Sequence, residues 1–138
     1  MTALVFDAIE LGQELPALEL PAINRTTLAL FAGASGDHNP IHIDSDFARQ
    51  AGMPDVFAQG MLSMAYLGRL LTNWTTQQHI RYFNARFLGI VQLGNILTCK
   101  GKVVEKYQQN GECLIKLELV GVTQYGENKI LGDALIVC

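Results

Sequence analysis

The stretch QGMLSMAYLGRLLTNW (residues 59–74) is apolar almost all the way round when it is placed on a helix. Its apolar character is interrupted mainly by Ser63, Arg69 and Thr72. A helix that is apolar on every side is buried rather than laid on a protein surface. About thirteen residues at the helical rise span about 20 Å, which is enough to cross the core of a small domain. The sequence therefore predicts one long buried helix with the rest of the chain around it.

The residues that follow this helix change to the period of a β-strand. In IRYFNARFLGI (residues 80–90), Phe83, Ala85 and Phe87 share one face. The polar side chains between them share the other face, as expected when successive side chains of a strand alternate. This segment is therefore predicted to be a strand with one face turned toward the helix.

A hairpin and a final strand are predicted beyond this segment. Residues 95–107 and 112–124 read as two long strands on either side of Asn110-Gly111. Asn-Gly between two such runs is the strongest short hairpin signal, because both residues of the tight turn have a positive φ. Residues 129–138 form the last predicted strand. We expect four strands after the helix, connected as a meander.

The N-terminal part of the chain has a different character. Residues 11–23 look extended, and Pro16 and Pro21 restrict them to an edge or an irregular strand. Residues 24–36 and 44–52 are predicted to be short helices. The economical arrangement is an α+β fold with a curved antiparallel sheet wrapped around one long central helix. The sheet keeps open edges in so small a chain, so pairing with a second copy is expected.

Composition limits the class of protein. The chain has 138 residues, which favours a single domain over residues 1–138, and 49% of them are apolar. A net charge of −3 argues against nucleic acid or an anionic membrane as a partner. Three cysteines without metal-binding spacing predict reduced, packed thiols in a cytoplasmic protein and no metal. The first residues resemble neither a signal peptide nor a membrane span.

The segment GDHNPIH (residues 36–42) combines turn residues with an acid and an imidazole. Asp37 and His42 are five residues apart, which on a helix leaves them about 140° from each other. On a strand, an odd separation places them on opposite faces. Pro40 also pushes Asn39 away from helical angles. Only a non-repetitive loop allows Asp37 and His42 to converge.

Several interpretations of this loop follow from the residues alone. Asp37 and Asn39 are common turn formers, so the segment can be a simple connecting turn in which His42 packs with a hydrogen bond. Alternatively, an acid and an imidazole share a water and exchange protons with it. A calcium loop would need an oxygen ligand where Ile41 stands and a glycine where His42 stands. A serine-based triad lacks the nucleophile-elbow sequence.

Residues 31–66 resemble the hydratase-2 signature of MaoC-like proteins. This family contains the (R)-specific enoyl-CoA hydratases and the (3R)-hydroxyacyl-thioester dehydratases. A weaker likeness to the family extends over residues 6–16 and 85–95. The positions that fit the signature are Phe31, Ser35, Gly36, Asp37, Asn39, Pro40, Ile41, His42 and Ala48.

The resemblance implies a hot-dog fold and a specific reaction. Asp37 and His42 would be the catalytic pair that activates a water for addition to C3 of a trans-2-enoyl thioester, or for the reverse dehydration. Asn39 would shape the water site. The backbone N–H of Gly60 would polarise the thioester carbonyl. The substrate would be carried on CoA or on the phosphopantetheine of acyl-carrier protein, with no other cofactor.

The sequence departs from the family at one informative position. The family usually has His before the helix glycine, and this chain has Gln59. Gln59, Ser63 and Tyr66 are predicted to line the substrate site. The departure leaves open a non-catalytic acyl-binding subunit of a hot-dog heterodimer, and an acyl thioesterase is a further alternative. A homodimer is expected, with higher oligomers and heterodimers open. Acyl-chain length, carrier and direction stay open as well.

Overall fold

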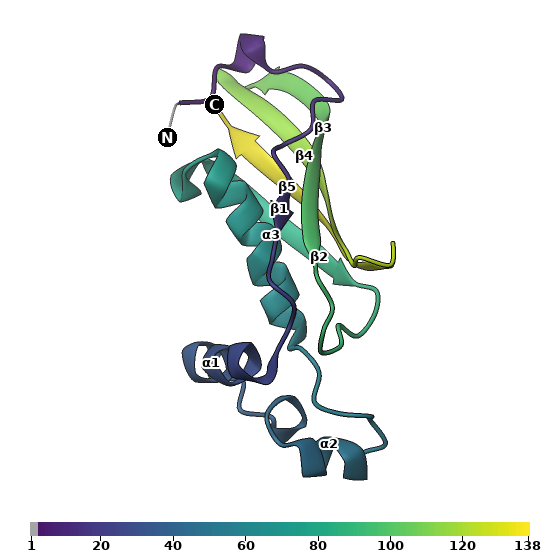
Figure 1. The fold of residues 1–138 in the computed structure, drawn as a ribbon. Coiled ribbons are helices and arrows are strands. Elements are labelled where there is room, and N and C mark those ends of the chain that lie inside the picture. The colour runs from purple at the N-terminus through teal and green to yellow at the C-terminus, as the bar shows by residue number, and fades with distance from the viewer. Residues whose placement is uncertain (1–2) are drawn as a thin grey trace.

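The computed structural model describes residues 3–138 as a curved antiparallel sheet with one long helix lying along it (Figure 1). That helix, α3, runs from Gly60 to Trp74 and coincides with the predicted buried helix. The helices α1 (Arg25–Ser35) and α2 (Ser45–Gln50) gather near its N-terminal end, away from most of the sheet. The fold therefore places the loop between α1 and α2 (residues 36–44) near the start of α3.

The five strands form one sheet in the order β1-β3-β4-β5-β2. The edge strand β1 is only two residues long, as its flanking prolines predict. The bounds are β1 Leu18–Glu19, β2 Ile80–Phe87, β3 Thr98–Gln109, β4 Glu112–Val122 and β5 Asn128–Val137. Short 3-10 turns occupy Phe6–Ala8, Pro40–His42 and Gln77–His79.

The prediction of a four-strand meander is wrong for the first of these strands. The meander holds for β3, β4 and β5, whereas β2 pairs with β5 instead of β3. The connection over residues 88–97 carries the chain across the end of the sheet before β3 begins. The hairpin prediction is confirmed, because Asn110 and Gly111 both have a positive φ, 53° and 79°.

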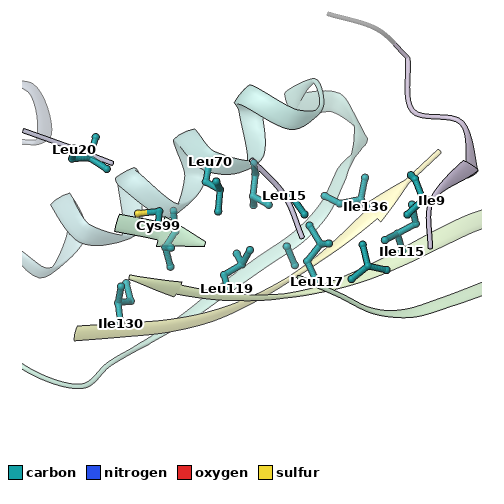
Figure 2. Close-up of a cluster of buried hydrophobic side chains, with 14 residues drawn as sticks. Ile9, Leu15, Leu20, Leu70, Cys99, Ile115, Leu117, Leu119, Ile130 and Ile136 are labelled. Carbon is teal, nitrogen blue, oxygen red and sulfur yellow. The ribbon is translucent and has the colours of Figure 1, made fainter. Parts of the chain in front are cut away.

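The core lies between α3 and the sheet. Leu67, Leu70 and Leu71 of α3 are fully buried against the inward side chains of the strands. Figure 2 shows Leu70 facing Leu117 and Leu119 of β4, with Ile130 and Ile136 of β5 nearby. Burial of apolar surface at about 25 cal/mol per Å² supplies most of the stability of such a layer.

The prediction that α3 is enclosed on all sides is wrong for one side. Met61, Ala65 and Arg69 are exposed and form a stripe along the helix away from the sheet. A five-stranded sheet curves around only part of a helix, so nothing within residues 3–138 covers the opposite stripe. No helix within residues 3–138 is long and apolar enough to cross a membrane.

The cysteines are free thiols, and only one of them is packed as predicted. Cys99 is fully buried in β3, and burial raises the pKa of its thiol to about 12. Cys113 is half-buried and Cys138 is exposed. Cys99 is therefore an unreactive core residue at neutral pH.

Gly33 in α1 offers a simple test of the helix. The position that a Cβ would occupy has no neighbour within 4 Å, and φ is not positive. We expect Gly33→Ala to raise the free energy of unfolding by about 0.5–1 kcal/mol, because alanine loses less backbone entropy in a helix. Urea denaturation measures this change. A lower stability would contradict the open space at this position.

Candidate active site

The loop between α1 and α2 is held by its own short side chains. Gly36 ends α1 in the left-handed region with a φ of 76°. The Ser35 hydroxyl accepts a hydrogen bond from the Asp37 N–H at 3.2 Å. The Asn39 side chain accepts one from the Ile41 N–H at 3.1 Å. These local bonds satisfy the loop's backbone and fix its path.

The loop brings together the two residues that regular structure would keep apart. His42 Nε2 lies 3.7 Å from Asp37 Oδ2. The His42 side chain is 11% exposed, whereas that of Asp37 is 40% exposed. The distance is longer than a direct hydrogen bond and suits two groups that share a third polar atom. The Asp37 carboxylate is therefore accessible to solvent, whereas the His42 imidazole is mostly buried.

The second ring nitrogen of His42 is fixed by a backbone carbonyl. Nδ1 lies 2.8 Å from the Phe57 carbonyl oxygen. A carbonyl oxygen only accepts, so Nδ1 carries the proton and, in the neutral ring, Nε2 presents a lone pair toward Asp37. The Phe57 ring meets the imidazole edge-on, with ring centres 5.1 Å apart. The ring is thus held in one orientation and one neutral tautomer.

A cavity of about 350 Å³ opens beside His42. Its wall includes two predicted site residues, Gly60 and Ser63, from the first turn of α3. The remaining lining residues come from the segments around Phe57 and β2 and from the start of β5: Phe57, Ala58, Phe87, Leu88, Gly89, Ile90, Val91 and Lys129. The structure therefore brings together His42, Gly60 and Ser63 in one apolar cleft.

Gly60 is the first residue of α3, where backbone N–H groups lack partners within the helix. The same end carries the positive pole of the helix dipole. A Cβ at Gly60 would lie 3.3 Å from the ring of Phe87, so the glycine allows that ring to approach closely. The start of α3 can therefore present an N–H group to a partial negative charge in the cavity.

Two of the predicted lining residues lie in the core instead of the cavity. Gln59 is fully buried and donates from Nε2 to the Leu28 carbonyl oxygen at 2.9 Å. Its Oε1 is buried without a partner among the described residues. Tyr66 packs against both apolar clusters and does not line the cavity. Gln59 thus links α1 to the start of α3 behind the cavity wall.

The Asp55 carboxylate connects the segments on either side of the loop between α1 and α2. Asp55 accepts hydrogen bonds from the Ser45 hydroxyl at 2.8 Å and the Val56 N–H at 2.7 Å. It also pairs with Arg25 at the start of α1, and with Arg49 of α2 at 3.5 Å. These contacts, led by the Ser45 hydrogen bond, lower the pKa of Asp55 to about 2. The clamp joins α1, α2 and the segment that carries the Phe57 carbonyl.

The Asp55 clamp predicts a pH-dependent stability. The folded-state pKa of about 2 is below the ordinary 3.8, so ionised Asp55 stabilises the fold above pH 4. That contribution is lost as the pH falls from about 4 to about 2. We expect Asp55→Asn to melt at a lower temperature than the wild type at pH 7, with the difference shrinking toward pH 2. Thermal melts across this range test it, with Asp46→Asn on exposed α2 as the control.

Sequence reasoning missed the Phe57 carbonyl, the Asp55 clamp and Lys129. A backbone carbonyl has no sequence signal, and Lys129 follows a turn in the way that many surface lysines do.

A larger cavity of about 720 Å³ lies on the outer face of the sheet, lined mainly by charged side chains such as Lys100 and Glu118. It shares no residue with the cavity beside His42.

The chain matches one family model and resembles several individual proteins. A family model described as MaoC like domain matches residues 9–123. Fatty acid synthase subunit beta of Saccharomyces cerevisiae is 30% identical over 113 residues, which cover 80% of this chain and 5% of that protein. The (R)-specific enoyl-CoA hydratase of Rhodospirillum rubrum is 30% identical over 95 residues, which cover 67% of this chain and 65% of that protein. This chain therefore spans about a twentieth of the fungal subunit's length.

The fold comparison confirms the predicted hot-dog architecture. R-hydratase PhaJ1 from Pseudomonas aeruginosa has a TM-score of 0.84 to this chain at 27% identity. The alignment covers 96% of this chain and 84% of that one. The chain thus shares the overall fold of this R-hydratase.

Proposed function

We propose that this chain, which belongs to the family of MaoC-like domains, adds water to trans-2-enoyl thioesters with (R) stereochemistry or removes it from (3R)-hydroxyacyl thioesters. The observation that carries the proposal is the 3.7 Å separation of Asp37 Oδ2 and His42 Nε2, together with the cavity that His42 lines. The names of two relatives, an R-hydratase and an (R)-specific enoyl-CoA hydratase, support this reaction class.

The geometry suggests roles for the acid and the imidazole. One water can donate one O–H to the Asp37 carboxylate and the other to His42 Nε2 across their separation. His42 Nε2, the free acceptor of the neutral ring, takes a proton from this water while the hydroxyl adds to C3. The resulting Nε2–H then delivers that proton to C2, so one water is added in full across the double bond. Asp37 orients the water and stabilises the transient imidazolium.

The first turn of α3 supplies the electrostatic half of the mechanism. Addition at C3 places negative charge on the thioester oxygen, as in an enolate. The Gly60 N–H and the helix dipole are positioned to stabilise this charge in the cavity. The buried hydroxyl of Ser63 borders the same space. Because the thioester itself acidifies C2, the proposed reaction uses no metal or prosthetic group.

Loss of the conjugated-thioester absorbance on adding crotonyl-CoA or longer enoyl-CoAs tests the proposal directly. We expect a time-dependent decrease that depends on enzyme concentration, and chiral analysis of the product should give the (R)-3-hydroxyacyl thioester. Release of free thiol instead would indicate a thioesterase. No change with any chain length on CoA or acyl-carrier protein would contradict the proposed activity.

The open edge of β2 supports a proposal about assembly. Within residues 3–138, β2 pairs only with β5, so its second edge has unpaired backbone groups. We propose that a second copy pairs there and forms a homodimer. Light scattering on the purified chain would give twice the chain mass. A monomer that becomes active only with a different hot-dog chain would instead support the heterodimer alternative, with this chain as the acyl-binding subunit.

A further inference from the structure

Lys129 is the one lysine or arginine side chain on the wall of the candidate site. It lies at the second position of β5 and lines the same cavity as His42, Gly60 and Ser63. Its side chain is only 15% exposed. The lining of this cavity contains no aspartate or glutamate, and the chain as a whole carries a net charge of −3. A cation at this place is therefore not a consequence of a generally basic surface.

The position of the ammonium group is set by contacts at its two sides. Nζ pairs with Glu127 Oε2 at 2.8 Å, and the Glu127 side chain is 59% exposed. On the other side lies Gly89, where an added Cβ would be 3.7 Å from Nζ, in ordinary van der Waals contact. The Leu88 N–H donates to the Lys129 carbonyl at 2.9 Å, which joins this lysine to the loop after β2. The ammonium thus lies where the cavity meets solvent.

We propose that Lys129 binds the carrier arm of the thioester substrate through its oxygen acceptors. This inference rests on the proposed enoyl-thioester function. With the thioester carbonyl at Gly60 and the water at His42, the carrier arm must leave the cavity toward solvent. The arm that CoA and acyl-carrier protein share is phosphopantetheine, whose amide carbonyls and phosphate all accept hydrogen bonds. A lysine ammonium at the cavity mouth donates to such acceptors and attracts the phosphate.

The alternative explanation is an ordinary surface ion pair between Lys129 and Glu127, which would contribute little to either binding or stability. The two explanations predict different values of KM for Glu127→Gln. If Lys129 binds the arm, then removing its competing carboxylate frees the ammonium, and KM for enoyl-CoA should fall about twofold. If the pair is only a surface contact, KM should not change.

Lys129→Met is the main variant, because methionine keeps the apolar stem and removes the charge. We expect KM for enoyl-CoA to rise about tenfold or more with kcat unchanged, as expected on losing a charge-assisted hydrogen bond made equally in ground and transition states. The variant should process an S-ethyl enoyl thioester, which has no arm, as well as the wild type does. Lys100→Met, on the outer face of β3, is the matched control and should match the wild type with both substrates.

Measuring KM with enoyl-CoA and with enoyl-acyl-carrier protein distinguishes the remaining outcomes. An equal rise in KM for enoyl-CoA and enoyl-acyl-carrier protein supports contact with the shared arm, whereas a rise for CoA alone would place the contact on its nucleotide and overturn the proposal. Equal losses with the CoA and S-ethyl thioesters would assign Lys129 to the reacting end instead. Calorimetric titration with free CoA needs no turnover, and weaker binding to Lys129→Met is expected even if the proposed hydratase activity fails.

Discussion

Asp37→Asn is expected to lower kcat for enoyl-CoA hydration by about 100- to 10,000-fold, the range for a positioned acid–base group. The amide has the same shape as the carboxylate, but it has no charge to stabilise a protonated His42 and presents a donor on one side. Because the Asp37 side chain is 40% exposed, the free energy of unfolding should change by less than about 0.5 kcal/mol. Initial rates with crotonyl-CoA and urea denaturation measure the two quantities separately.

Asp46→Asn is the control for the loss of one negative charge near the site. Asp46 lies on α2 and is exposed, and its carboxylate pairs with Arg49 at 4.0 Å. Its replacement should leave kcat and KM within a factor of two of the wild type. If both Asp37→Asn and Asp46→Asn kept full activity, the assignment of Asp37 as the catalytic partner of His42 would be wrong. The family and the fold would not be affected.

The site loop was the part of the candidate site that the sequence could predict. The spacing of Asp37 and His42 is incompatible with convergence on a helix or a strand, and Pro40 pushes Asn39 away from helical angles, so any convergence required a non-repetitive loop. That the two residues pair was implied by the family resemblance. The anchoring of His42 by the Phe57 carbonyl could not be predicted in this way. It depends on the packing of α2 and the segment before α3, and a carbonyl acceptor leaves no mark in the side-chain sequence.

The fold could be predicted where periodicity is local and not where pairing is distant. The long helix and the Asn110-Gly111 hairpin both followed from patterns within about fifteen residues. The pairing of β2 with β5 instead of β3 depends on the path of residues 88–97, which has no regular pattern. Gln59 shows the same limit, because its neighbour Leu28 is 31 residues away in sequence.

The largest stability effect is expected at Gly132 in β5. Its φ is not positive, so the backbone does not require glycine, but a Cβ there would lie 2.9 Å from the Asn84 carbonyl oxygen. It would also lie 3.3 Å from Leu67 of α3. Because the first of these atoms is backbone, a side-chain rotation cannot relieve the clash. We expect Gly132→Ala to lower the free energy of unfolding by about 2–3 kcal/mol.

Gly132→Ala should also disturb the cavity, because Gly132 lies opposite Ala85 in the β2–β5 pair and β2 ends at Phe87, whose ring covers Gly60. Urea denaturation and KM for enoyl-CoA would both respond, with Gly33→Ala as the control of opposite sign. Combining Gly132→Ala with Leu67→Ala separates the two contacts. Removing the leucine side chain leaves the Asn84 oxygen in place, so the two losses should add. A double variant more stable than Leu67→Ala alone would show that the clash is with α3, and that β2 can shift without cost.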